Sequence, residues 1–448
     1  MDINEKSHAG DTPLHLLCKN LLHTDVQQKI RLIEKMLAHR PGELEIDAKN
    51  NEEIRPIFFA CMSCEVDLLR FLAEKCKADL LCTSADGLNL LHVILEEHAT
   101  TIDHEEETME SKKEKCLNYL LNECQAEDLV HDRDDRDLLP YQVAIISRLE
   151  KIALQLISLA DDREILEPAG SYRSLSIAAG RGLLSVVKEL IRKGAEPNLL
   201  DGDEGDEITA LQMACVSDSE NEEVVKLLAK MTEFEVLKEC QESIFQVCID
   251  QGSWKCLKIL MEEYPDMDDL AIDIDCSNSK YSMVTPLSYL IGWTIHDETI
   301  LECVKIFIEK GCDLNGTRKA GRIPALIALG RYYKYPKTPN EYTTQIIDQL
   351  VKAGAKISHE FRFAEEIARF DMRMLLMYLK KAVVSPEKSL VKYYAARIGT
   401  VPPSPSSFQT WVELSGIILF TFTEFFYIYL VSCLFTFAEL AGICLHFN

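Results

Sequence analysis

Basic residues are scarce in this 448-residue chain, which has 48 Lys and Arg against 73 Asp and Glu and a formal net charge of −25. A surface that binds duplex nucleic acid needs a basic face, and none stands out in the sequence. The composition therefore argues against nucleic acid as a partner. An acidic chain favours solubility and a basic partner instead.

The motifs of common catalytic and cofactor sites are also absent. The sequence has no Gly-rich loop followed by Lys-Ser or Lys-Thr, no dinucleotide fingerprint and no His-Glu-x-x-His pair. A single Cys-x-x-Cys, formed by Cys61 and Cys64, has no second pair at the spacing that a zinc site needs. We interpret that pair as helix packing in preference to metal or redox chemistry. We predict no enzyme activity, no cofactor and no metal site.

The N-terminus lacks a basic segment followed by an apolar run, so no secretory signal peptide is predicted. The 16 cysteines are scattered through apolar stretches, as at Cys215, Cys248 and Cys256. Secreted disulfide frameworks are usually shorter and denser in cysteine. Buried thiols in a reducing compartment fit better, which predicts a cytoplasmic or nuclear location for most of the chain.

What the sequence does contain is a recurring phrase. It reads Gly-Asp-Thr-Pro-Leu-His-Leu-Leu-Cys at residues 10–18 and Val-Thr-Pro-Leu-Ser-Tyr-Leu at residues 284–290. Threonine caps a helix, and proline suits the first helical turn, where its missing N–H costs nothing. Each copy therefore predicts a helix start. Aligned on the proline position, the copies fall at residues 13, 56, 89, 140, 174, 210, 244, 286 and 324.

A second amphipathic helix is predicted after each phrase, for example at residues 186–191, 224–228 and 346–351. Gly194, Gly311 and Gly354 follow such segments, and glycine there takes the left-handed conformation that ends a helix. The unit is two helices, a glycine stop and an extended loop.

This unit resembles the ankyrin-repeat family, whose period is about 33 residues and whose core phrase is Thr-Pro-Leu-His. The resemblance implies an all-α ankyrin-repeat solenoid of about nine to ten helix-turn-helix units over residues 1–383. The last, degraded unit would be residues 359–383. The implied function is a protein–protein interaction adaptor or scaffold, with partners bound on a concave face of loop fingers and first helices. His15 and His92 occupy the position at which the family's imidazole braces the loop.

Residues near the expected fingertips are the best candidates for partner contact. They are Asp86, Asp201, Asp203, Asp206, Asp275, Lys319 and Arg322. The acidic finger at residues 201–207 does not have EF-hand spacing, so we interpret it as an acidic loop or a docking site for a basic partner. A charged insertion at residues 96–114 separates the two helices of the third repeat. It is either a solvated helix extension or loop, or a partner-specific contact.

The character of the chain changes after the repeats. Residues 384–410 form a Pro- and Ser-rich linker, and residues 411–448 form a hydrophobic C-terminal segment. Within it, residues 414–438 carry one charge, Glu424, and as a helix would reach about 37 Å against a hydrocarbon core of ~30 Å. We predict a single transmembrane helix that anchors cytoplasmic repeats, because Lys388, Lys392 and Arg397 precede it. The alternatives are a buried helix, an aberrant end, or the truncated cytosolic ankyrin arm of a membrane cation channel.

Overall fold

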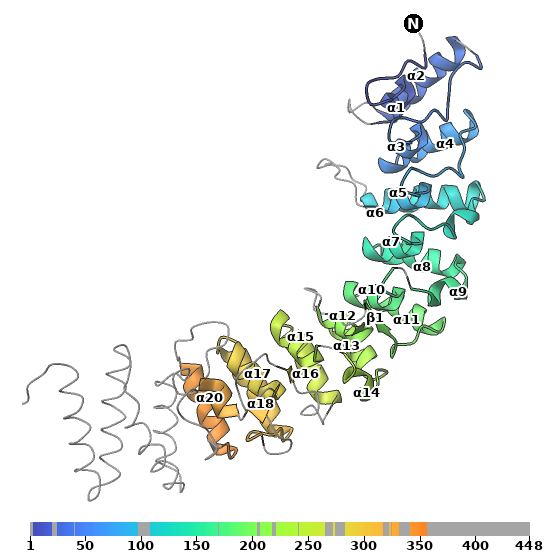
Figure 1. Cartoon of the computed structure of the whole chain (residues 1–448). Coiled ribbons are helices and arrows are strands. Elements are labelled where there is room, and N and C mark those ends of the chain that lie inside the picture. The colour runs from blue at the N-terminus through green and yellow to red at the C-terminus, as the bar shows by residue number, and fades with distance from the viewer. Residues whose placement is uncertain are drawn as a thin grey trace, which may run out of the picture. The chain divides into compact units, whose positions relative to one another are not determined.

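The computed structural model describes residues 3–19, 25–39, 41–96, 108–168, 170–203, 207–216, 221–240, 242–264, 272–273, 283–316, 322–323, 325–330 and 341–355. The chain divides into two compact units, Met1–Glu233 and Phe234–Asn448 (Figure 1). The predicted last repeat (359–383), linker (384–410) and hydrophobic segment (411–448), with its candidate span 414–438, lie outside the described residues.

The first unit is a series of helix pairs. Its elements are α1 (Pro13–Cys18), α2 (Val26–His39), α3 (Pro56–Met62), α4 (Val66–Glu74), α5 (Leu90–Leu95), α6 (Met109–Asn118), the π-helix η1 (Tyr119–Glu123), the 3₁₀-helix η2 (Glu127–Val130), α7 (Pro140–Ile146), α8 (Glu150–Leu159), α9 (Asp162–Leu166), α10 (Ser174–Arg181), α11 (Leu184–Arg192), β1 (Leu200–Asp201), β2 (Ile208–Thr209), α12 (Ala210–Val216) and α13 (Glu222–Ala229).

Helices of the same kind stack on one another in this unit. The first helix of a pair packs on the first helices before and after it, as α10 does on α7 and α12, while α11 packs on α8 and α13. In Figure 1, α3, α7 and α10 lie in one column and α4, α8 and α11 in the other. Because each pair contacts only its neighbours, the core extends along the stack without one centre.

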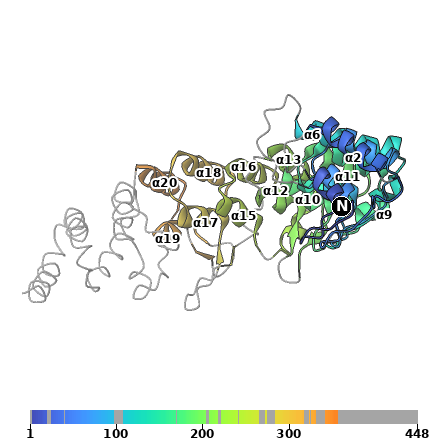
Figure 2. The same ribbon diagram turned by 90° about the horizontal axis from the view of Figure 1, so that it is seen from above.

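The second unit repeats this arrangement. Its elements are α14 (Phe234–Leu237), α15 (Ile244–Gln251), α16 (Trp254–Glu263), β3 (Ile272–Asp273), β4 (Met283–Val284), α17 (Pro286–Trp293), α18 (Glu298–Glu309), β5 (Arg322–Ile323), α19 (Ala325–Gly330) and α20 (Glu341–Lys352). Figure 2 shows α15, α17 and α19 in one row and α16, α18 and α20 in the other. The total number of repeats stays a prediction, because the chain after residue 355 is not described.

The predicted helix starts are confirmed at Pro13, Pro56, Pro140 and Pro286, whereas Pro324 lies outside the described residues. Proline occupies the first turn of α1, α3, α7 and α17. The marker at residue 89 is wrong by one residue, since α5 begins at Leu90. Asn89 is instead the N-cap, and its side chain accepts the His92 N–H at 3.1 Å. Asparagine replaces threonine as the N-cap residue here, so the phrase Asn-Leu-Leu-His aligns one residue later than we placed it.

The predicted glycine stops are confirmed as well. Gly194, Gly311 and Gly354 have φ values of 101°, 76° and 93°, all in the left-handed region. The predicted second helices at 186–191, 224–228 and 346–351 lie within α11, α13 and α20.

The structure also contains short strands, which the predicted all-α class did not include. β1 and β2 pair antiparallel, with Leu200 opposite Thr209, and β4 pairs antiparallel with β3 and parallel with β5. Each of these strands has two residues, so the sheets are short and occur in only some of the described loops between repeats. Among the described helices, none combines the length and the apolar character that crossing a bilayer requires.

Candidate functional site

Four loops of the first unit fold into the same turn, which we call finger turns 1 to 4. They span residues 7–11, 50–54, 84–88 and 134–138. In each, the first residue's N–H donates to the last residue's carbonyl, at 2.9, 3.0, 2.9 and 3.1 Å. The first residue's side-chain oxygen accepts the last residue's N–H, at 3.2, 2.9, 3.2 and 2.9 Å. Ser, Asn, Ser and Asp supply that oxygen, and all three types favour such turns.

Neighbouring finger turns are tied to each other through the backbone. The Asn51 N–H of turn 2 donates to the Ala9 carbonyl of turn 1 at 3.1 Å. The Asp135 N–H of turn 4 donates in the same way to the Asp86 carbonyl of turn 3, also at 3.1 Å. A Cβ on Gly10 would lie 2.4 Å from Asn51 Oδ1, and the φ of Gly10 is +79°. The close stacking of turns 1 and 2 therefore requires glycine at position 10.

Buried polar groups hold the base of the turns. Asn50 Nδ2 donates to Asp11 Oδ1 at 2.8 Å, and both residues are buried. In turn 4 the buried Asp134 Oδ1 accepts the N–H groups of Arg136 and Leu138, each at 2.9 Å. These bonds satisfy groups that burial would otherwise leave unpaired at a cost of about 1–3 kcal/mol each.

The predicted histidine brace is confirmed. His15 Nδ1 accepts the Thr12 N–H at 3.0 Å, and its Nε2 lies 3.0 Å from the Ile54 carbonyl in finger turn 2. This geometry assigns the proton to Nε2, so a neutral imidazole joins the cap of α1 to the next loop. Burial lowers the pKa of His15 below its ordinary value, which favours that neutral form.

Glutamine takes the same place in two other repeats. Gln142 Oε1 accepts the Leu139 N–H at 2.8 Å, and Gln212 Oε1 accepts the Thr209 N–H at 3.0 Å. His92 also lies at this position, with Nδ1 2.8 Å from Asn89 Oδ1 and Nε2 2.9 Å from the Leu138 carbonyl. Histidine and glutamine are thus alternative braces at one position.

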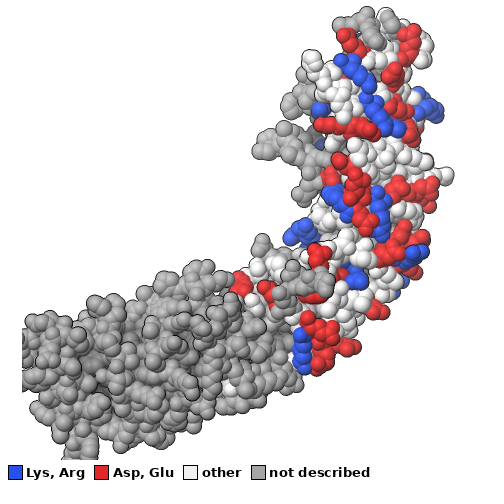
Figure 3. All heavy atoms as spheres, viewed as in Figure 1, with Lys and Arg blue, Asp and Glu red and all other residues white. Residues whose placement is uncertain are grey.

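The outer ends of finger turns 2 to 4 are acidic. Turns 2 to 4 expose the carboxylates of Glu52, Glu53, Asp86, Asp135 and Asp137. The basic side chains beside them pair with acids: Lys49 with Glu53 at 2.9 Å, Arg133 with Asp137 at 3.4 Å and Arg136 with Asp134 at 2.6 Å. Figure 3 shows basic and acidic groups side by side on the described part of the first unit. After these pairs are counted, the exposed ends of finger turns 2 to 4 keep a net negative charge.

The first helices of the middle repeats offer little exposed surface. All six residues of α5 are buried, and so are Pro56–Cys61 of α3 and Pro140–Ile145 of α7. A helix that is apolar on every side belongs to a core. In repeats two to four, the finger turns supply exposed polar groups beside these buried helices.

The predicted contact residues differ in their placement. Asp86 is exposed at the end of finger turn 3, and Asp203 is exposed with its Oδ1 accepting the Ser171 hydroxyl at 2.8 Å. Asp201 is buried in β1, where its carboxylate pairs with Arg173 at 2.5 Å and accepts the Arg173 N–H at 3.1 Å. Its position favours a structural role over the partner contact that we predicted.

The remaining predicted contacts cannot be placed with Asp86 and Asp203. Asp206, Asp275 and Lys319 lie outside the described residues, and of Arg322 only the backbone, in β5, is described. Sequence reasoning missed the acidic residues Glu52 and Asp135. The sequence could have indicated these residues. Each finger turn ends directly before the N-cap residue of the next helix, so its exposed residues can be located by counting back from that cap.

The charged insertion contains a buried cation that we did not predict. Residues 109–114 belong to α6, while residues 97–107 lie outside the described residues. Lys113 is buried, and its Nζ donates to the carbonyls of Leu95 at 3.0 Å and Glu96 at 2.8 Å. A cation at the C-terminal end of α5 is favourable, since the carbonyls there lack helical partners.

One side-chain cluster in the described part of the chain has the donors for a metal. His131, Asp161 and Glu164 offer ligand atoms within 4.8 Å of one another. Glu164 already accepts the Asp161 N–H at 3.0 Å in the capping box of α9, and it pairs with His131 Nδ1 at 3.0 Å. The helix cap and the hydrogen-bond contact with His131 account for this arrangement, and we assign it no metal.

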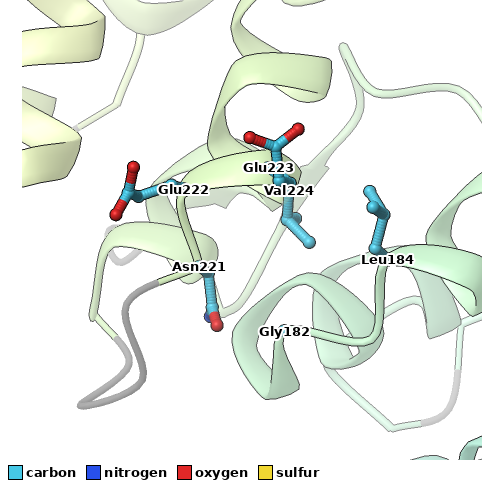
Figure 4. A pocket seen from close by; sticks show the side chains of 6 residues that line it. All are labelled: Gly182, Leu184, Asn221, Glu222, Glu223 and Val224. Carbon is cyan, nitrogen blue, oxygen red and sulfur yellow. The ribbon is translucent and has the colours of Figure 1, made fainter.

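A shallow hollow lies where the helices of repeats five and six are joined. It is lined by Gly182, Leu184 and residues 221–224. Figure 4 shows the Asn221 side chain directed at the turn of Gly182, and a Cβ on that glycine would lie 2.1 Å from Asn221 Oδ1. Asn221 Nδ2 also lies 3.4 Å from the Ala179 carbonyl. The hollow is therefore a junction between repeats, with no convergent groups for a ligand.

Comparison with known proteins identifies the repeat. The family model for ankyrin repeats (3 copies) matches residues 175–271. The chain contains ankyrin repeats. Ankyrin repeats generally mediate protein–protein interaction, and nothing in the match indicates catalysis. Among the curated proteins compared by sequence, none matches this chain.

Two solved ankyrin-repeat domains resemble the structure. The human ASB11 ankyrin repeat domain is 18% identical with a TM-score of 0.41, and the match covers 57% of this chain and 98% of that one. The ankyrin repeat domain of Bcl-3, described as a unique member of the IkappaB protein family, is 20% identical with a TM-score of 0.39. That match covers 57% of this chain and all of the other.

Proposed function

We propose that this ankyrin-repeat protein is an interaction scaffold whose first unit binds a basic segment of a partner protein through finger turns 1 to 4. The observation that carries the proposal is the fixed backbone of these turns. Each turn is closed by its own hydrogen bonds, and further bonds tie turn 1 to turn 2 and turn 3 to turn 4, so the loop backbones need little further ordering on binding.

The charge of the turns supports the choice of partner. The Lys and Arg side chains in or next to turns 2 and 4 pair with acids of the same surface, while Glu52 and Asp86 extend the negative excess at the exposed ends. Complementary charge gives an interface specificity and speeds association more than it raises affinity. We therefore expect binding that weakens as salt is raised.

A charge-reversal variant of the full-length chain tests the surface. Glu52→Lys with Asp86→Lys reverses two fingertip charges, and Glu34→Lys with Glu74→Lys makes the same change in net charge on the second helices α2 and α4. Each tagged chain is used to capture proteins from cells, and the captured proteins are quantified by mass spectrometry. We expect the fingertip variant to capture a defined set of partners in amounts lower by about tenfold or more. Like charges across an interface cost several kcal/mol.

The control variant should keep that set of partners. Equal loss in both variants would point to net charge alone, and no loss in the fingertip variant would exclude this surface as the binding site. Circular dichroism of both variants checks that neither change unfolds the repeats.

We also propose that residues 414–438 tether the scaffold to a membrane. Support comes from composition, since 25 residues with the single charge of Glu424 are long enough to span a bilayer. Fractionation of the full-length chain against a chain ending at Ser407 is the test. The full-length chain should sediment with membranes and resist extraction by carbonate, and the shorter chain should not. Equal distribution of the two would contradict the tether.

A further inference from the structure

An asparagine that is followed by glycine lies in the loop after α18. Asn315-Gly316 is the single Asn-Gly dipeptide of the chain, and it begins four residues after the helix stop at Gly311. The Asn315 side chain is partly exposed, and its Nδ2 donates to the Gly354 carbonyl at 3.1 Å. Gly354 is the helix stop of α20, which packs on α18, so this amide joins two neighbouring repeats of the second unit.

The first unit has an asparagine at the same loop position. Asn198 lies four residues after the helix stop at Gly194, and its Oδ1 accepts the Glu233 N–H at 2.8 Å. Asn198 thus binds the next repeat with its carbonyl oxygen, whereas Asn315 binds the next repeat with its amide nitrogen. An aspartate at residue 198 would keep the acceptor, but an aspartate at residue 315 would lose the donor.

The Asn-Gly sequence is chemically unstable in water. Glycine has no side chain to keep its backbone nitrogen away from the side-chain carbonyl of the preceding asparagine. That nitrogen can attack the carbonyl carbon, which closes a cyclic imide and releases ammonia. Asn198 is followed by Leu199, whose side chain hinders the same approach. The two asparagines therefore differ in reactivity as well as in the bond that each makes.

We propose that Asn315 is a site of spontaneous deamidation, and that the reaction weakens the packing of α20 on the repeat before it. The Gly316 nitrogen attacks Cγ of Asn315, the bond from Cγ to Nδ2 breaks, and ammonia leaves with the proton of the Gly316 nitrogen. Water then opens the cyclic imide at either carbonyl and leaves aspartate or isoaspartate at residue 315. The two steps balance as one amide and one water giving one carboxylic acid and one ammonia.

The hydrogen bond to Gly354 controls the rate of this reaction. While α20 is packed on α18, the bond restrains the rotation that would bring Cγ of Asn315 to the Gly316 nitrogen. The reaction therefore proceeds when the two repeats separate locally. Deamidation at residue 315 records how often this end of the described stack opens.

The same bond makes the reaction consequential. The carboxylate that replaces the amide has no proton to donate, and it faces a carbonyl oxygen at the negative end of α20. Asp313 adds a second negative charge nearby, because its Oδ1 accepts the Asn315 N–H at 3.1 Å. A chain that has reacted cannot restore the original contact when the repeats close again.

Ageing of the full-length chain tests the site. The chain is kept in mildly alkaline buffer with and without urea, and samples taken at successive times are digested with trypsin in weakly acidic buffer. Asn315 falls in the peptide 311–318 and Asn198 in the peptide 194–226. We expect aspartate and isoaspartate at residue 315 and unchanged Asn198. In urea the rate at Asn315 should be higher by about tenfold or more, because the packed repeats no longer protect it.

Two results would overturn the assignment of the site. One is a peptide 311–318 that is still unchanged in the folded chain at the end of the series, after the urea-treated chain has converted fully. The other is an equal rate with and without urea, which would show that the bond to Gly354 does not protect the amide.

Hydrogen exchange tests the effect on packing. Asn315→Asp copies the direct product, and Asn198→Asp is the matched control that keeps its acceptor. Exchange of the α20 backbone amides should be faster by about three- to tenfold in the full-length Asn315→Asp chain, as expected for the loss of one hydrogen bond. In the Asn198→Asp chain it should not change. Equal exchange of α20 in the two variants would contradict the proposed weakening.

A third variant separates deamidation from other effects of ageing. Asn315→Gln has a longer side chain that must close a larger ring, so it reacts far more slowly. Exchange in α20 should become faster on ageing in the wild-type chain and stay constant in the Asn315→Gln chain. If ageing changes both chains equally, residue 315 is not the cause.

Discussion

At the scale of the residue, the most consequential buried charges are a pair that joins the first two repeats. Lys29 Nζ of α2 lies 2.7 and 2.8 Å from the two carboxylate oxygens of Glu65, the N-cap residue of α4. Their side chains are 1% and 12% exposed. Burial raises the pKa of Glu65, and the hydrogen bond from Lys29 opposes that shift. The carboxylate is thus kept charged by its partner.

Removing only the cation should be costly. We expect Lys29→Met to lower the free energy of unfolding by about 3–5 kcal/mol, since it leaves a buried carboxylate unpaired. The double variant Lys29→Met, Glu65→Leu should regain most of that loss, as urea unfolding followed by circular dichroism will show. Lys226→Met, which breaks an exposed pair with Glu223, serves as the control and should have little effect. A single variant as stable as the wild type would contradict the role of the pair.

The His15 brace predicts a pH dependence. The unfolded chain binds its proton with the ordinary pKa of 6.5, whereas burial lowers the pKa in the folded chain. As the pH falls through about 6.5, the unfolded state takes up the proton first, so the free energy of unfolding decreases. His15→Gln, which copies the brace of Gln142, should be less sensitive between pH 7 and pH 5 in urea unfolding. An unchanged slope would show that His15 does not titrate in this way.

At the scale of the element, the finger turn is the feature that positions the exposed surface. Its geometry depends on a side-chain oxygen at the first residue and a left-handed residue at the fourth. Gly10, Glu53, Gly87 and Asp137 occupy that fourth position, with φ values of 79°, 59°, 69° and 62°. Glycine is required where the next turn lies against it, and other residues serve where it does not.

Two glycines separate backbone strain from crowding. Gly10→Ala would place a Cβ 2.4 Å from Asn51 Oδ1 and 2.6 Å from Asn51 N, at a φ of +79°. Gly42→Ala has nearly the same φ, +80°, and meets nothing within 4 Å. We expect Gly42→Ala to cost about 1 kcal/mol and Gly10→Ala to cost more, about 2–4 kcal/mol, in thermal or urea unfolding. Equal losses would show that the stacking of turns 1 and 2 contributes nothing.

Proline and glycine made the bounds of the helices predictable from sequence. The placement of the candidate contact residues was harder to predict, because it depends on pairs of residues that are distant in the sequence. Pro13, Pro56, Pro140 and Pro286 fix helix starts by covalent geometry, so local sequence was enough. Asn89 misled the alignment because an asparagine cap replaces the threonine. The burial of Asp201 depends on Arg173, 28 residues away, and no local pattern carries that information.

At the scale of the whole molecule, the helices of the first unit form a continuous series of packed neighbours. Within Met1–Glu233, each pair packs on the pairs before and after it. Stability in such a stack is close to a sum of repeat and neighbour contributions, so a cut between repeats removes little. The predicted boundary at residue 383 and the C-terminal segments stay predictions.

A fragment of residues 1–233 should therefore fold alone. We expect a helical circular dichroism spectrum and one cooperative urea transition for this fragment. A fragment of residues 1–216 lacks α13 and leaves the apolar faces of α11 and α12 uncovered, so it should unfold at lower urea or aggregate. If the two fragments are equally stable, or if 1–233 is unfolded, the unit boundary is wrong.

The finger turns separate the positions that build the loop from the positions that a partner can touch. Ser7, Asn50, Ser84 and Asp134 make the turn, whereas Glu52 and Asp86 extend from it without supporting it. Selection can therefore change the outer residues with little penalty to folding, much as the variable loops of an antibody change on a constant framework. Divergence among related chains should concentrate at these outer positions, and a new binding specificity could be engineered there while the framework residues are left as they are.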